Sequence, residues 1–279
     1  YLYSYDMLGE AAITDADARS YHMAYADAIA QIAKAASGED ISKNPGISIK
    51  LSALHPNYDL QHRSEVMAQL VPRARSLALL AKSVGIGLNI DAEEAARLDL
   101  SLDVIGAVLS ERSLAGWDGF GVVVQAYGKR AAYVIDWLYA LAQHLDRRIM
   151  VRLVKGAYWD TEIKLAQVEG LPGFPVLAAK PHTDIQYICC ASKLLAMSDR
   201  IYPQFATHNA HTIAAVLHSA AAQNVTKFEF QRLHGMGEAL HDQVLQDHGV
   251  ACRIYAPVGH HSDLLAYLVR RLLENGANF

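Results

Sequence analysis

Short apolar segments rich in β-branched and aromatic residues alternate along the chain with longer segments of helical periodicity. Eight segments have the length and composition of strands: Tyr1–Leu8, Gly46–Ser52, Ile86–Asp91, Gly119–Gln125, Arg148–Val154, Ile201–Ala206, Lys227–Gln231 and Cys252–Ala256. The intervening pattern predicts helices over Thr14–Ala36, Arg63–Ser83, Asp99–Leu109, Ala131–Leu145, Thr161–Val168, Asp184–Ala196, His211–Ala222, Glu238–Gln246 and Ser262–Asn275.

Eight strand–helix units in 279 residues predict a (βα)₈ barrel of the TIM type that forms a single domain over 1–279. The alternative is an open, doubly wound sheet, but no glycine-rich dinucleotide fingerprint follows the first strand. The chain carries neither a signal peptide nor an initiator methionine, so we expect it to be a piece of a longer protein.

The composition narrows the class of protein. Hydrophobic residues make up 52% and charged residues 19%, which excludes a disordered chain. A net charge of −4 argues against a nucleic-acid binder, and no apolar run is as long as a membrane span. Three cysteines cannot form a disulfide framework, so we interpret Cys189 and Cys190 as small core residues of a protein in a reducing compartment, the cytoplasm.

Polar residues lie in or directly after the C-terminal end of every predicted strand, where the active sites of such barrels lie. In chain order they are Glu10, Lys50, Asp91, Gln125, Tyr127, Arg152, Lys155, Thr207, His208, Asn209, Gln231, Arg232, His234 and Tyr255. Their recurrence at all eight ends predicts a polar pocket above an apolar core.

This pocket would be rich in cations, contributed by Lys50, Arg152, Lys155, His208, Arg270 and Arg271. Such a cluster favours an anionic ligand, either a carboxylate or a phosphate. The alternative is that each cation pairs with a nearby acid, as Arg270 could with Glu274 one helical turn later. The histidines His208, His211, His260 and His261 lack the spacing and the cysteine partners of a zinc site, so we predict no metal.

Seven segments together resemble the proline dehydrogenase domain of the bacterial bifunctional flavoenzymes called proline utilization A, and the resemblance runs in order from one end of the chain to the other. The segments are 3–10 (YSYDMLGE), 46–56 (GISIKLSALHP), 89–94 (NIDAEE), 152–160 (RLVKGAYWD), 204–209 (QFATHN), 253–259 (RIYAPVG) and 267–277 (YLVRRLLENGA).

The resemblance implies a distorted (βα)₈ barrel whose last helix lies over the barrel mouth and which holds FAD without a covalent bond. It implies oxidation of L-proline to Δ1-pyrroline-5-carboxylate, the first step of proline catabolism, by hydride transfer from proline C5 to flavin N5. A membrane quinone would take the electrons. The parent chain would carry an aldehyde dehydrogenase domain and could associate peripherally with the inner membrane, whereas this chain would bind no nucleic acid.

The resemblance also implies roles for individual residues. Arg270 and Arg271 would clamp the proline carboxylate, which Lys50 also faces, and Glu10 would pair with Arg270. Tyr255, Leu153 and Tyr158 would line the substrate, with Asp91 supporting the basic cluster. The catalytic residues implied in this way are Lys50, Asp91, Arg152, Tyr255, Arg270, Arg271 and Glu10.

For the flavin, the resemblance implies that Arg152 lies near N5, that Gln125 contacts the ring system and that Thr207 and His208 reach the pyrophosphate or ribose. The full implied set of cofactor-binding residues is Asp91, Gln125, Arg152, Val154, Lys155, Gly156, Ala157, Trp159, Thr207, His208, Asn209, Gln231, Leu233 and Glu274. Three rival hypotheses remain: a flavin barrel similar to methylenetetrahydrofolate reductase, a barrel that only senses an anionic metabolite, and a metal-dependent hydrolase.

Overall fold

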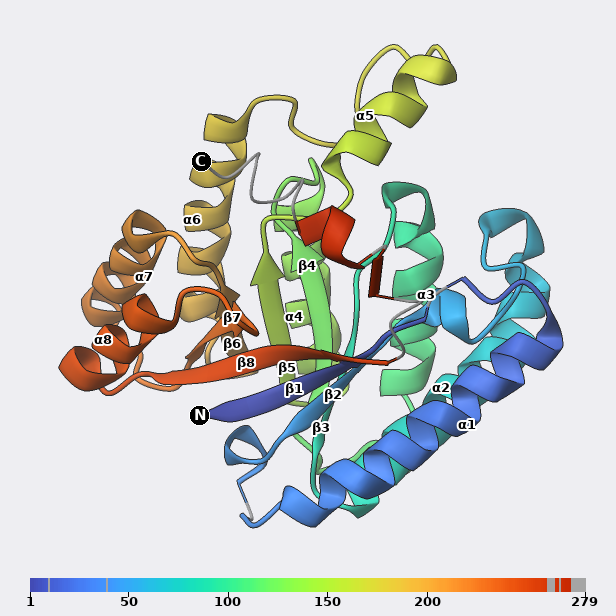
Figure 1. Ribbon diagram of the computed structural model, residues 1–279, viewed down its shortest axis with the longest axis horizontal. Coiled ribbons are helices and arrows are strands. Elements are labelled where there is room, and N and C mark those ends of the chain that lie inside the picture. The colour runs from blue at the N-terminus through green and yellow to red at the C-terminus, as the bar shows by residue number, and fades with distance from the viewer. Residues whose placement is uncertain (10, 39, 260–263, 266, 272–279) are drawn as a thin grey trace.

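Eight parallel strands close into a barrel in the order of the sequence in the computed structural model, which describes residues 1–9, 11–38, 40–259, 264–265 and 267–271 (Figure 1). The strands are β1 (Leu2–Met7), β2 (Gly46–Ile49), β3 (Gly87–Ile90), β4 (Phe120–Gln125), β5 (Ile149–Val154), β6 (Ile201–Ala206), β7 (Glu229–Leu233) and β8 (Ala251–Val258). The last strand closes the barrel against the first, in register from Leu2 opposite Arg253 to Met7 opposite Val258.

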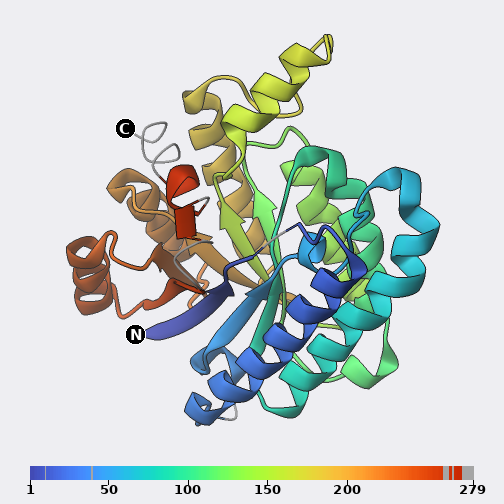
Figure 2. The ribbon, with the colours of Figure 1, turned by 45° about the vertical axis from the view of Figure 1, so that its right-hand side comes forward.

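The helices lie outside the barrel, and α5 projects away from its body (Figures 1 and 2). They are α1 (Asp15–Ile32), α2 (Arg63–Ser83), α3 (Leu98–Leu109), α4 (Ala131–His144), α5 (Trp159–Val168), α6 (Lys180–Ala196), α7 (Ala210–Ala222) and α8 (Glu238–His248). Residues 264–265 and 267–271 are also helical. In the described ranges, no helix has both the length and the apolar character needed to cross a bilayer.

The prediction of a (βα)₈ barrel is confirmed, and the open sheet is excluded because β1 pairs with β8. Most element boundaries agree within a few residues, and α2 has the predicted ends. The largest shifts are four residues, at the end of α1, which is Ile32 rather than Ala36, and at the start of α6, which is Lys180 rather than Asp184. The second residue of α6 is Pro181, whose fixed φ and missing N–H suit the first turn of a helix.

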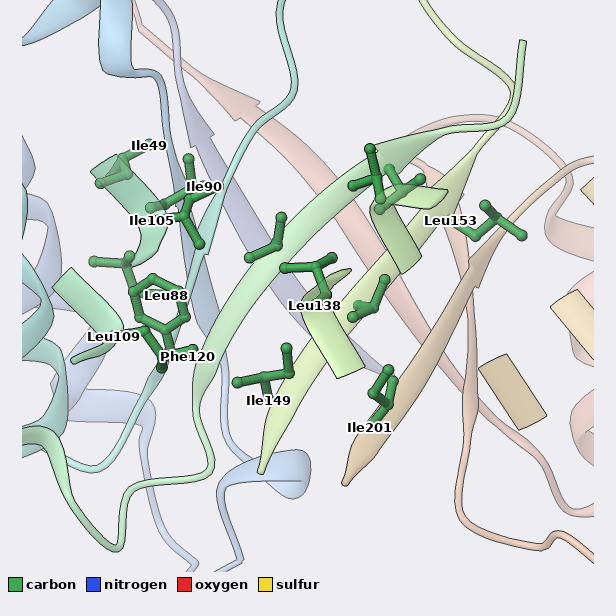
Figure 3. Close-up of a cluster of buried hydrophobic side chains, with 14 of the residues drawn as sticks. Ile49, Leu88, Ile90, Ile105, Leu109, Phe120, Leu138, Ile149, Leu153 and Ile201 are labelled. Atoms are coloured by element: carbon green, nitrogen blue, oxygen red, sulfur yellow. The ribbon is translucent and has the colours of Figure 1, made fainter. Parts of the chain in front are cut away.

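Apolar side chains fill the layer between the strands and the helices, where Ile49, Ile90, Leu138 and Leu153 lie in one buried cluster (Figure 3). The inside of the barrel is polar instead. Near the N-terminal ends of the strands, Arg253 Nε donates to Glu229 Oε1 at 2.7 Å, and both side chains are almost fully buried. The pleat of each strand therefore sends apolar residues outward and many polar residues inward.

The expected placement of the adjacent cysteines in the core is confirmed for Cys190 and is wrong for Cys189. Cys190 is buried in the core, but Cys189 is exposed on the outer face of α6. Adjacent residues of a helix point about 100° apart, so both could not face the same core.

Candidate active site

Four charged side chains meet inside the barrel near the C-terminal ends of its strands, and all four are buried. Lys50 Nζ lies 2.6 Å from Asp6 Oδ1 and 3.2 Å from Asp91 Oδ2. Arg152 Nη1 lies 3.2 Å from Asp91 Oδ1. The Tyr255 hydroxyl donates to Asp91 Oδ2 at 2.9 Å, so Asp91 links both cations to the tyrosine. We call these four charged residues, Asp6, Lys50, Asp91 and Arg152, the charged tetrad.

Arg152 is held by several partners besides Asp91. Its Nη1 donates to Ser48 Oγ at 3.0 Å, and its Nη2 donates to Ser4 Oγ at 3.1 Å. Its guanidinium carbon lies 4.9 Å from the centre of the Tyr255 ring, a distance typical of a cation–π contact. The strand pleat explains this convergence, because inward positions recur every two residues along each strand.

Burial and the charges of the tetrad shift the pKa values of Lys50, Asp6 and Tyr255. Burial opposes the charge of Lys50, but the carboxylate of Asp6, together with Tyr255 and Asp91, raises the pKa of Lys50 well above its ordinary range. Burial, together with the charge of Asp91, raises the pKa of Asp6, although Lys50 opposes this. Burial also raises the pKa of Tyr255. We therefore expect Tyr255 to be a neutral hydrogen-bond donor and Lys50 to be fully charged near neutral pH.

A cavity of about 340 Å³, the mouth pocket, opens above the tetrad. It brings together most of the residues named from the sequence: Lys50, Asp91, Gln125, Arg152, Val154, Lys155, Gly156, Ala157, Tyr158, Thr207, His208, Asn209, Gln231, Leu233, Tyr255, Arg270 and Arg271. All eight strands, or the residues directly after them, therefore contribute to one site, as expected for the C-terminal face of a barrel.

The C-terminal helical segment, residues 264–265 and 267–271, supplies Tyr267, Arg270 and Arg271 to the lining of the mouth pocket. Each arginine is positioned by an aromatic ring. The guanidinium of Arg270 lies 5.6 Å from the Tyr158 ring centre, and that of Arg271 lies 4.9 Å from the Tyr267 ring centre. The expected pairing of Arg270 with Glu10 and the alternative pairing with Glu274 both fall on residues outside the described ranges.

The other end of the mouth pocket is built from the tips of β5, β6 and β7. Lys155 Nζ pairs with Asp184 Oδ1 at 2.5 Å. Asn209 caps α7, its Oδ1 accepting the Thr212 N–H at 3.0 Å. Gly156 has a φ of +136°, and a Cβ there would come within 2.5 Å of the Tyr127 ring, so this turn requires glycine.

The polar atoms of this pocket fit an FAD molecule. Three buried atoms, Arg152 Nε, Gln231 Oε1 and Arg232 Nε, have no hydrogen-bond partner within the part of the chain that the structure describes. All three residues line the pocket. Buried donors and acceptors are normally satisfied, and guanidinium groups beside a helix N-terminus suit a pyrophosphate. The cations Lys155, Arg270 and Arg271 and the amides and hydroxyls that line the pocket are donors of the kind that the pyrophosphate and ring system of FAD accept from.

Among the described residues named from the resemblance, Leu153 and Trp159 do not line the mouth pocket. Glu10 and Glu274 lie outside the described ranges. Leu153 is fully buried between the barrel wall and the helices, because its strand neighbours Arg152 and Val154 take the inward positions (Figure 3). Trp159 begins α5, and its Nε1 donates to the Leu177 carbonyl at 2.9 Å. For Leu153 the structure therefore corrects the expectation that it packs on the substrate.

Sequence reasoning missed Asp6, Ser4 and Ser48 as parts of the site. A signal was available, because Ser4 and Asp6 are polar residues two positions apart in an aromatic strand. The same spacing joins Ser48 to Lys50, the residue directly after β2. In a strand such pairs share one face, and here that face is the inside of the barrel.

His208 is neutral in this site and acts as an acceptor. Its Nε2 accepts the Leu233 N–H at 2.9 Å. Burial, and to a lesser extent the nearby His241 and Arg232, lower the pKa of His208 to about 4. Among the described residues, no group of three or more histidine, cysteine, aspartate or glutamate side chains is arranged to hold a metal ion.

We expect the free energy of unfolding to fall as the pH falls from about 6.5 to about 4. In this range His208 binds a proton in the unfolded chain but stays neutral in the folded protein. The loss attributable to His208 should be about 1–3 kcal/mol. Urea unfolding at about pH 7 and about pH 4.5 measures it. The variant His208→Gln should show a smaller pH dependence than the wild type. An equal dependence in both proteins would contradict the assignment.

Comparison with known proteins supports the reading of this site. A family model described as proline dehydrogenase matches residues 1–279. The chain is 59% identical over 283 residues to Bifunctional protein PutA of Salmonella typhimurium, covering 99% of this chain and 21% of that protein. It is 56% identical over 280 residues to Bifunctional protein PutA of Rhizobium meliloti, covering 99% and 22%. The chain thus spans about a fifth of the length of these relatives.

Solved structures agree with these matches. A crystal structure of a mutant of Bradyrhizobium japonicum Proline Utilization A superposes with a TM-score of 0.96 at 61% identity, covering 99% of this chain and 28% of that one. Proline utilization A from Bdellovibrio bacteriovorus, inactivated by N-propargylglycine, superposes with a TM-score of 0.91 at 33% identity, covering 98% and 30%. With its whole length matched by the family model and its barrel by these structures, this chain belongs to the proline dehydrogenase family.

Proposed function

We propose that this chain oxidises L-proline to Δ1-pyrroline-5-carboxylate with FAD as its non-covalent cofactor. The observation that carries the proposal is the mouth pocket, which combines the buried charged tetrad with two arginines from the C-terminal helical segment. The membership of the family supports this reading over a reductase, a sensor or a hydrolase.

The chain's own residues would bind and orient the substrate. Arg270 and Arg271 would hold the proline carboxylate from the helical side, and Lys50 would face it from the barrel. Tyr255 would present its ring to the pyrrolidine while its hydroxyl stays bonded to Asp91. A carboxylate held at several points fixes the ring of the substrate, so orientation at C5 would follow from contacts away from the reacting bond.

The residues that would hold the cofactor lie along the rest of the pocket. Arg152, Gln125 and Lys155 would face the ring system, and Thr207, His208 and Gln231 the pyrophosphate, ribose and adenine. When bound, FAD supplies the hydride acceptor at its N5 atom. The positive charge of Arg152, fixed by Asp91, Ser4 and Ser48, would stabilise negative charge that develops nearby.

We further propose that the chain is one domain of a longer bifunctional protein that includes an aldehyde dehydrogenase domain. The short share of the relatives that it spans, and their description as bifunctional, support this. A membrane quinone as the electron acceptor, and peripheral contact of the parent protein with the inner membrane, complete the proposal.

A visible spectrum of the anaerobic protein tests the function directly. We expect a bound-flavin spectrum that bleaches when L-proline is added and stays unchanged with D-proline, because the carboxylate clamp is chiral. A flavin that ignores L-proline would indicate a different flavin barrel. A colourless protein that still binds L-proline in calorimetry would favour the sensor.

A further inference from the structure

Lys50 is held by two carboxylates that are placed unequally. Asp6 Oδ1 lies 2.6 Å from Lys50 Nζ, closer than Asp91 Oδ2 at 3.2 Å. The two oxygens of Asp91 also serve Arg152 and the Tyr255 hydroxyl. Asp91 is therefore shared among three partners, and Asp6 makes the shortest contact with Lys50.

Charged and titratable groups face Lys50 from several elements. They are Asp6 on β1, Asp91 after β3, Arg152 on β5, Tyr255 on β8 and Tyr25 on α1. Two carboxylates thus balance two cations in a region that is almost closed to water. Without Asp6, Lys50 and Arg152 would share the single charge of Asp91, and burial would favour the loss of a proton from Lys50.

We infer that Asp6 is a positioning residue that keeps Lys50 protonated and aimed at the site of the substrate carboxylate. This inference rests on the proposed function, because it takes the anionic end of the substrate to lie beside Lys50. Nothing in the inference requires Asp6 to touch the substrate.

The electrostatics of the pair agree with the geometry. Burial is the largest single influence on the pKa of Lys50 and lowers it. Among the groups that raise this pKa, Asp6 has the largest effect, and the combined effect of Asp6, Tyr255 and Asp91 exceeds that of burial. Buried lysines without such partners can titrate several pH units below the ordinary value. Removing the charge of Asp6 should therefore bring the pKa of Lys50 down toward the working pH range.

Binding of cyclopentanecarboxylate to the FAD-loaded protein, measured by calorimetry between about pH 7 and about pH 10, tests the inference. This probe has the carboxylate of proline but no amine, so the probe itself does not change its charge over this pH range. The wild type should keep its affinity across the range. Asp6→Asn should lose affinity by about tenfold or more between about pH 7 and about pH 9 as Lys50 deprotonates.

Two further variants separate positioning from folding. Asp6→Glu restores the negative charge and should recover the wild-type pH profile. Glu162→Gln alters a different buried carboxylate, which accepts the Ala95 N–H at 2.6 Å, and should also keep that profile. If Asp6→Asn binds the probe with the wild-type pH profile, or if Asp6→Glu fails to recover that profile, the inference is overturned.

The same measurements distinguish a failure of the proposed function from a failure of the role inferred for Asp6. If the wild-type protein neither binds the probe nor oxidises L-proline, the assignment of the mouth pocket is wrong. If the wild type does both and Asp6→Asn keeps an unshifted profile, the function stands and the role of Asp6 falls.

Discussion

Replacing either arginine of the C-terminal helical segment should raise the Michaelis constant for L-proline by about a hundredfold. Arg270→Met and Arg271→Met each remove one guanidinium from the lining of the mouth pocket while keeping an unbranched side chain of similar length. The loss of one partner of a desolvated charge pair costs about 2–5 kcal/mol, and about 1.4 kcal/mol corresponds to a factor of ten. Steady-state kinetics with varied L-proline measures the effect.

A matched control is Arg63→Met, which removes an arginine that pairs with Asp103 on the outer helices. Its Michaelis constant should stay at the wild-type value. Arg270→Lys should recover only part of the affinity, because an ammonium cannot bind a carboxylate in the bidentate manner of a guanidinium. An unchanged Michaelis constant in Arg270→Met or Arg271→Met would refute the carboxylate clamp.

The barrel could be predicted from the sequence because its strands and helices have different periods. Short apolar runs such as Ile201–Ala206 alternate with long stripes such as that of α2, and only eight such units fit the length of the chain. Element ends were harder, because they depend on caps and on local proline chemistry. The start of α6 at Lys180 shows this, since Pro181 there begins a helix that apolar spacing alone places later.

The site was predictable wherever a polar residue ends a strand, since the strand ends of a barrel share one face. Lys50, Asp91, Arg152 and Tyr255 were found in this way or from the resemblance, and they lie together. The error at Leu153 and the omission of Ser4, Asp6 and Ser48 have one physical origin, which is the two-residue period of the strand. Leu153 follows an inward arginine and so must face the helices.

The same period hides Asp6 from a search that looks only at strand ends. Asp6 precedes Met7, the last residue of β1, and its neighbour Tyr5 is apolar. Its role depends on Lys50, which is 44 residues away in the sequence and belongs to the neighbouring strand segment. Pairing across strands depends on the register, which places Tyr5 opposite Ile47 and Asp6 opposite Ser48. Composition and residue spacing do not determine that register, and it is known only from the strand pairing in the closed barrel.

Replacement of Asp91 by asparagine should lower kcat/KM for L-proline by roughly two to three orders of magnitude. Asp91 is the only residue of the charged tetrad that contacts both cations, with Lys50 and Arg152 each 3.2 Å from one of its oxygens. An amide of the same size keeps the volume but leaves two buried cations facing one carboxylate, that of Asp6. Removing one preorganised electrostatic group from an active site lowers the rate by about two to three orders of magnitude.

A milder variant for comparison with Asp91→Asn is Tyr255→Phe, which removes one hydrogen-bond donor to Asp91 but no charge. A hydrogen bond to a charged carboxylate contributes about 1.5–3 kcal/mol, so kcat/KM should fall by roughly tenfold to a hundredfold, less than for Asp91→Asn. Urea unfolding of Asp91→Asn and of Glu162→Gln separates the loss of fold from the loss of the site, since both variants alter a buried carboxylate. If Asp91→Asn retains kcat/KM within the range of Tyr255→Phe, the carboxylate does not organise Lys50 and Arg152, and the site must hold them by the serines and Asp6 instead.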